Sequence, residues 1–99
     1  MTGKQRAYLR KLANPLDAIF QVGKNGINDE LIRQVDETLT KRELIKLRVL
    51  ETAPIKAREA ADLLSAATNS HSIQVIGMRF VLYRENKQIE KEKRILLPV

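Results

Sequence analysis

Apolar residues in this chain change repeatedly between the spacing of a helix and the alternation of a strand, and this change constrains the fold most strongly. The stretch Leu44–Leu50 alternates apolar and basic side chains, as expected of a strand with one buried face. Before it, Leu31, Val35 and Leu39 recur at helical spacing. Because all such segments fall within 99 residues, we expect one domain with one core.

Start and stop signals place the boundaries of these segments. Thr2 and Gln5 fit a capping box, and Pro15 disfavours helix at the residue before it. Asn28 is a favourable N-cap for a second helix, and Gly77 marks the turn of a β-hairpin. The predicted order is helix 2–14, strand 16–22, helix 28–41, strand 44–50, helix 55–69, strand 72–76 and strand 79–84.

The order α-β-α-β-α-β-β predicts a single compact α/β domain, in which helices pack on a four-stranded mixed sheet. The third helix is predicted to pack closely through Ala57, Ala60, Ala61, Leu64 and Ala67. This domain would span residues 1–84. Residues 85–99 are mostly charged and end in an apolar stretch, which predicts a C-terminal extension that either docks on the body or adds a short strand.

Positive charge points to a polyanionic partner, chiefly nucleic acid. The chain has 18 Lys and Arg residues against 12 Asp and Glu, a net charge of +6. Up to Gly26 the single acidic residue is Asp17. The basic residues in the same stretch are Lys4, Arg6, Arg10, Lys11 and Lys24. The excess charge is therefore concentrated near the N-terminal end of the chain.

Several other classes of protein find no support in the sequence. Without cysteine there are no disulfides or thiolate metal sites, and His71 has no second histidine to share a metal. No apolar run has the length of a membrane span, and the N-terminus lacks the apolar stretch of a secretory signal. The default expectation is a cytoplasmic protein without a membrane partner or metal.

Catalytic and cofactor motifs are also missing. The glycine spacing fits neither a Walker loop nor a dinucleotide fingerprint. The serines lack a GxSxG context, and no pair of carboxylates is singled out for acid–base work. We therefore expect no catalytic residues, no cofactor and no small-molecule substrate, and we predict that the protein is not an enzyme.

The loop Gly23-Lys24-Asn25-Gly26 is the first candidate for contact with a phosphate. It follows a predicted strand and opens a predicted helix, where glycines allow a sharp turn and close approach of a ligand. Lys24 adds charge and Asn25 adds hydrogen-bonding capacity, while Asp29 partly offsets the charge. Spacing alone leaves a plain structural turn as the competing interpretation.

Further basic residues extend this candidate surface. Arg6, Arg10 and Lys11 lie near one another on the first helix. The predicted strands add Lys46, Arg48, Arg79 and Arg84. Each could contact a nucleic-acid backbone, and each could also simply keep an outward surface soluble. Phe80 and Tyr83 are the nearest aromatic residues, and core packing is the favoured interpretation for both.

Taken together, these segments resemble the CRM domain, named for chloroplast RNA splicing and ribosome maturation. The resemblance rests on the stretch Ala18–Ile27 with the GxxG loop, the strand Glu43–Val49 and the closing hairpin Ile73–Arg84. It covers roughly residues 2–84 with every element in order. A single stand-alone copy resembles the bacterial YhbY-type members.

The resemblance implies a fold similar to the C-terminal domain of a bacterial translation initiation factor. It also implies RNA binding with the loop Gly23–Gly26 as a contact, and by analogy a role in ribosome biogenesis on ribosomal RNA of large-subunit precursors. The alternative is a protein-interaction module that docks on an acidic ribosomal or translational partner. The sequence does not indicate an oligomer, so a monomer is the default.

Overall fold

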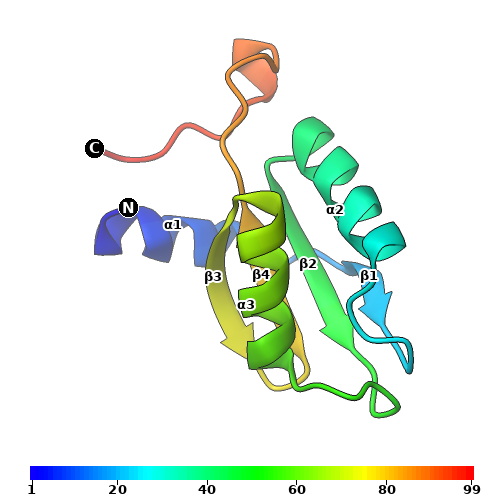
Figure 1. Ribbon diagram of the computed structural model, residues 1–99. Coiled ribbons are helices and arrows are strands. Elements are labelled where there is room, and N and C mark those ends of the chain that lie inside the picture. Colours follow the sequence, from blue (N-terminus) through cyan, green and yellow to red (C-terminus); the bar gives the residue numbers. More distant parts are fainter.

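Three α-helices and four strands follow one another in the order that the sequence predicts. The computed structural model describes residues 1–99 (Figure 1). The elements are α1 (Gly3–Ala13), β1 (Ala18–Val22), α2 (Asp29–Lys41), β2 (Leu44–Val49), α3 (Ala57–Thr68), β3 (His71–Ile76), β4 (Arg79–Tyr83) and a short 3₁₀ helix, η1 (Lys91–Lys93). No helix is long and apolar enough to cross a membrane.

The four strands form one mixed sheet in the order β1-β2-β4-β3. β1 runs parallel to β2, and the remaining neighbours are antiparallel. Ala18, the first residue of β1, lies opposite Lys46, so Leu44 and Ile45 at the start of β2 extend past the beginning of β1. The predicted α/β fold with a four-stranded mixed sheet is confirmed.

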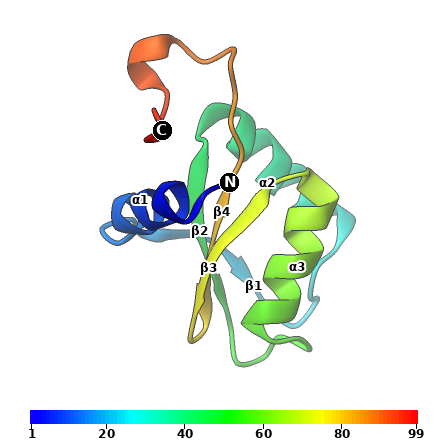
Figure 2. The same cartoon turned by 90° about the vertical axis from the view of Figure 1, so that its left-hand side faces the viewer.

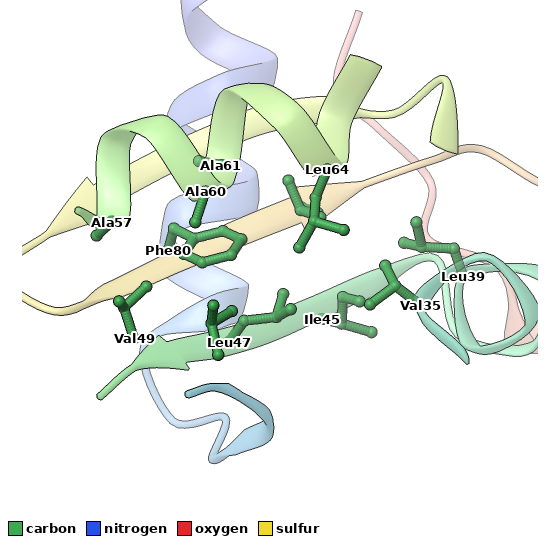
Figure 3. Packing of buried hydrophobic residues seen from close by; sticks show 12 residues of the cluster. Val35, Leu39, Ile45, Leu47, Val49, Ala57, Ala60, Ala61, Leu64 and Phe80 are labelled. Atoms are coloured by element: carbon green, nitrogen blue, oxygen red, sulfur yellow. The ribbon is translucent and has the colours of Figure 1, made fainter. Parts of the chain in front are cut away.

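Helices α2 and α3 cover one face of the sheet and bury the larger part of the core. This cluster contains 12 buried residues contributed by both helices and by β1, β2 and β4. Figure 3 shows Phe80 of β4 between Ala60 of α3 and Leu47 of β2. The small side chains of Ala60 and Ala61, both fully buried, let α3 approach the sheet closely.

Helix α1 packs on the opposite face and crosses the strands there (Figure 2). A second, separate cluster fills this contact. Its members are Leu9, Ala13, Leu44, Ile73, Val81 and Tyr83. The apolar interior is therefore divided between the two faces of the sheet, where the sequence predicts one core.

The helix starts follow the predicted capping chemistry. Thr2 accepts a hydrogen bond from the Gln5 N–H at 3.1 Å, and the Gln5 side chain accepts one from the Thr2 N–H at 3.0 Å. Asn28 accepts from the Leu31 N–H at 2.9 Å. These bonds satisfy donors that the first turn of a helix leaves without an intrahelical partner.

One packing prediction is wrong. Ala67 is exposed, and Thr68 is buried in its place. The buried stripe of α3 continues four residues beyond Leu64 to Thr68, which leaves Ala67 beside the stripe. The buried Thr68 hydroxyl donates to the Leu64 carbonyl oxygen at 2.7 Å, so its polar group is satisfied.

The C-terminal segment leaves β4 and turns back over α1 (Figure 2). Buried Glu43 holds it, because its two carboxylate oxygens accept the backbone N–H groups of Asn86 and Ile95 at 2.8 and 2.7 Å. Ile95 and Leu97 pack against the α1 cluster. The segment adds no strand to the sheet.

Candidate nucleic-acid interface

Helix α1 covers only part of its face of the sheet, because it crosses the strands rather than following them. The strand register shows which residues lie on the part of this face that α1 leaves open. We call this part the uncovered half of the sheet, and it consists of Gln21, Lys46, Arg48, Gln74, Ile76 and Arg79. In Figure 2 it lies below α1, on the side away from α3.

Arg48 and Arg79 lie directly opposite each other on neighbouring antiparallel strands. Cβ atoms of such a pair are about 5 Å apart, and like charges at that spacing destabilise the sheet. Both residues are exposed, and neither belongs to any of the chain's ion pairs or side-chain hydrogen bonds. An anion placed between them would relieve their mutual repulsion.

Helix α1 borders this half of the sheet along one flank. Asn14, at its C-terminal end, lines a hollow of 140 Å³ with Lys46, Gln74 and Arg79 among its other walls. The Asn14 carbonyl oxygen accepts a hydrogen bond from the Lys46 ammonium at 3.4 Å. Arg10 lies one turn before Asn14, so helical geometry puts it on the same flank.

The loop Gly23–Gly26 is a tight turn at the end of the sheet that carries Arg48. The Gly26 N–H donates to the Gly23 carbonyl oxygen at 2.9 Å. Gly26 has φ +63°, and a Cβ there would lie 3.2 Å from Cγ of Pro54. At Gly23 a Cβ would meet only Leu50 at 3.8 Å, an ordinary contact. Only Gly26 therefore requires glycine, although the sequence suggests a role for both.

Lys24 and Asn25 form the exposed tip of this turn. Their backbone N–H groups have no acceptor within the protein, so both can donate to a ligand. The start of α2 is already compensated, since Asn28 caps it and Glu30 adds charge to its first turn. A bound anion would therefore contact the turn rather than the helix end.

Two of the predicted site residues hold the fold together instead of facing solvent. Arg6 donates to the carbonyl oxygens of Ser72 and Ile73 at 2.7 and 3.3 Å, which ties α1 to the edge strand β3. Arg84 pairs with the Asp36 carboxylate at 2.6 Å and also donates to the Thr68 carbonyl oxygen at 2.7 Å.

Arg84 thus joins α2, α3 and β4, away from the uncovered half of the sheet. It makes two further bonds, to the Asp36 carbonyl oxygen at 2.9 Å and to the Thr40 hydroxyl at 3.0 Å. Lys11 is exposed on α1, one residue past Arg10, and is rotated about 100° from it around the helix. The structure therefore gathers Arg10, Lys46, Arg48 and Arg79 with the Gly23–Gly26 turn nearby, and separates them from Arg84.

Two polar residues of this surface do not stand out in the sequence. Gln21 lies opposite Arg48, and Gln74 lies opposite Val81. Alternation with Phe20 and Val22 could have placed Gln21 on this face. A register shift between Ser72 and Gln74 breaks the alternation of β3, so periodicity alone could not place Gln74.

The aromatic side chains near this surface are in the core, as predicted. Phe80 is 1% and Tyr83 2% exposed, so neither is available to stack on a base. Burial of the Tyr83 hydroxyl, reinforced by the charges of Glu43 and Glu85, raises its pKa to about 12. The hydroxyl has no hydrogen-bond partner. No group of three or more His, Asp or Glu side chains is placed to hold a metal ion.

These features define a class: a small basic α/β domain with one closed sheet face and one half-covered face that carries unpaired cations. The chain belongs to the CRS1/YhbY (CRM) domain family, whose model matches residues 1–84. The predicted resemblance is therefore confirmed.

Similar proteins are found in several bacteria. The chain is 44% identical over 98 residues to "Probable RNA-binding protein YqeI" of Bacillus subtilis, with 99% of each chain covered. It is 28% identical to a Haemophilus influenzae protein named "RNA-binding protein", covering 99% of this chain and 95% of that one. The solution structure of the hypothetical protein SAV1595 from Staphylococcus aureus matches with a TM-score of 0.80 and 52% identity over 99% of both chains.

Proposed function

We propose that this protein binds RNA, and that it contacts RNA phosphates from the uncovered half of the sheet and from the Gly23–Gly26 turn. The observation that carries the proposal is the pair Arg48 and Arg79, two exposed cations directly opposite each other without an acidic partner. Such a pair is unfavourable in the free protein and favourable around a phosphate. The names of the relatives from B. subtilis and H. influenzae support the same ligand.

Recognition through the backbone fits this surface better than base reading. Base-stacking platforms need exposed aromatic rings, whereas Phe80 and Tyr83 are buried. The uncovered half of the sheet offers guanidinium, ammonium and amide groups, which suit phosphate and sugar oxygens. The affinity should therefore depend strongly on salt and weakly on sequence.

Within this proposal the RNA is ribosomal RNA in precursors of the large subunit, and the protein acts in ribosome assembly in the cytoplasm without catalysing a reaction. The chain matches the CRM domain over residues 1–84. The ribosomal partner rests on the resemblance to stand-alone bacterial members, which implies such precursors by analogy. A protein of this kind would bind folded RNA by shape and charge.

The first experiment compares the Arg48 and Arg79 pair with the two cations at its borders, Arg10 on α1 and Lys24 in the turn. Fluorescence anisotropy would measure affinity for a structured ribosomal RNA fragment with three double variants: Arg48→Glu with Arg79→Glu, Arg10→Glu with Lys24→Glu, and Arg58→Glu with Lys91→Glu as a control of equal charge. We expect the first to weaken binding by about tenfold or more and the second to weaken it less. Wild-type affinity in the first two variants, with folding verified by circular dichroism, would refute the proposal.

The second experiment tests the ribosomal partner. The protein should co-sediment with precursors of the large subunit, and complete nuclease digestion should release it. Crosslinks should map to β2, β4 and the Gly23–Gly26 turn. Association that survives digestion would instead support the competing hypothesis of an acidic ribosomal or translational protein as the partner.

A further inference from the structure

A groove of 510 Å³ opens where α1 ends and β2 begins. It exists because β1 starts only opposite Lys46, so Leu44 and Ile45 of β2 extend past the beginning of their neighbour. The connection from α1 to β1 forms one wall, the corner between α2 and β2 a second, and the C-terminal segment at Lys93 and Ile95 a third.

The groove has an exposed aliphatic lining. Leu16 is 38% and Ile19 41% exposed, and half-buried Leu12 lies in the same wall. Exposed apolar side chains scattered singly are ordinary on a protein surface, but here two of them, with half-buried Leu12, line one concave site. A groove of this kind takes aliphatic side chains out of water.

Positive charge surrounds this lining. The charged residues of the groove are Lys41, Arg42, Lys46, Lys93, Asp17 and Glu43. Both carboxylate oxygens of Glu43 already accept backbone N–H groups of the C-terminal segment. Lys41 and Arg42 are exposed and belong to none of the ion pairs, so they are available to a partner.

An open strand edge lies beside the groove. β1 is an edge strand, and its residues Ala18–Val22 include neither a charged residue nor proline. Proteins commonly place charged residues or proline on an edge strand, because these prevent pairing with another chain. An extended peptide can add to an edge of this kind through main-chain hydrogen bonds while its side chains enter a neighbouring pocket.

We propose that this groove and the β1 edge bind an extended acidic segment of another protein, with one or two aliphatic side chains seated against Leu16 and Ile19. The basic rim selects acidic residues, and the aliphatic lining favours a peptide over RNA, which has no aliphatic side chain to bury. A second copy of this chain is disfavoured because it carries the same net charge of +6. The groove shares Lys46 with the proposed RNA site, but its aliphatic lining, Lys41 and Arg42 lie outside that site.

The test is a titration of ¹⁵N-labelled protein with a synthetic peptide of aspartate and glutamate residues that contains two leucines. We expect backbone amide shifts at residues 16–19, 41–46 and 93–95, with a Kd of about 1 mM or tighter. Ile19→Asp and Leu16→Ser should each weaken binding by about fivefold or more, which is about 1 kcal/mol for a lost aliphatic contact. Ile76→Asp, on the other edge strand and 62% exposed, is the matched control and should bind the peptide normally.

Several results would overturn the proposal. Absence of shifts at these residues at millimolar peptide would do so, as would equal binding of a peptide in which alanine replaces the leucines. Shifts of the groove amides on dilution of the protein alone would identify a second copy as the occupant. Shifts at residues 16–19 and 93–95, away from the shared Lys46, on addition of RNA alone would assign the groove to RNA. Ile19→Asp should keep wild-type RNA affinity. A failure of the peptide proposal can therefore be distinguished from a failure of the RNA-binding proposal.

Discussion

The two faces of the sheet differ in how completely helices cover them. On one face α2 and α3 bury a cluster of 12 residues, while on the other α1 buries a cluster of six and leaves Arg48 and Arg79 outside its contact. Both faces belong to the same four strands, so neighbouring residues of one strand contribute to opposite faces. Residues of β2 therefore alternate in role. Those that face α2 and α3 stabilise the fold, whereas the basic residues on the other face are available for binding.

The same division separates two arginines at opposite ends of β4. Arg84 joins α2 and α3 to the strand through an ion pair and three further hydrogen bonds. Arg79 has no partner within the protein. Because a guanidinium without a partner adds little to stability, its charge is free to act on a ligand.

The largest expected effect comes from the closed face. Leu47 is fully buried, so Leu47→Ala should lower the free energy of unfolding by about 2–5 kcal/mol, from lost burial and the cavity that remains. Urea denaturation measures it. Gln21→Ala, an exposed position on the neighbouring strand, is the control and should change stability by about 0.5 kcal/mol or less. Equal losses in the two variants would contradict the division of the faces.

A crossed pair of arginine variants sharpens the comparison. Arg84→Ala should lower the free energy of unfolding by about 2 kcal/mol, since it removes charge-assisted bonds to Asp36 and leaves the Thr68 carbonyl oxygen without its donor. Arg79→Ala should leave stability nearly unchanged and weaken RNA binding. Denaturation and anisotropy on the same samples check both. Weaker RNA binding by folded Arg84→Ala would contradict this separation of a stabilising arginine from a binding one.

The two glycines of the Gly23–Gly26 turn should respond differently. Gly26→Ala should cost about 1–2 kcal/mol, because an L-residue at positive φ is strained and its Cβ would press on Pro54. Gly23→Ala has room for a methyl group and should be close to neutral. Thermal unfolding of the two variants side by side gives the difference in stability. A larger loss of stability in Gly23→Ala would contradict the assignment of the strained position to Gly26.

The smallest expected effect lies under α1, where the buried Tyr83 hydroxyl lacks a partner. Tyr83→Phe should raise the free energy of unfolding by about 1 kcal/mol. It should also change the pH dependence. The folded protein keeps the phenol proton up to a pKa of about 12, whereas the unfolded chain releases it near 10. The free energy of unfolding should therefore be constant with respect to this group below pH 10 and fall as the pH rises from 10 to 12, and this fall should be absent in Tyr83→Phe.

Local signals were sufficient for most of the fold. The capping box at Thr2, the cap at Asn28 and the alternation of β2 each depend on residues close in sequence, and all three predictions are confirmed. Ala67 was misplaced because periodicity cannot say how far a buried stripe extends, which depends on the sheet beneath it.

The candidate site was less predictable, because it depends on partners that are distant in sequence. Arg79 and Arg84 look equivalent along the chain, yet only the tertiary fold brings Asp36 to Arg84 across 48 positions. The groove beside β1 likewise follows from the register of β1 against β2 and from the docking of the C-terminal segment. Neither has a signature in local sequence, and the RNA contacts of the predicted site residues remain a prediction.

The salt dependence of RNA binding tests the central claim most directly. If Arg48 and Arg79 each neutralise one phosphate, replacing both by alanine should reduce the slope of log K against log salt by about 1.5. The control Arg58→Ala with Lys91→Ala removes the same charge from exposed positions elsewhere and should keep the wild-type slope. An unchanged slope in Arg48→Ala with Arg79→Ala would show that the uncovered half of the sheet does not contact the RNA backbone.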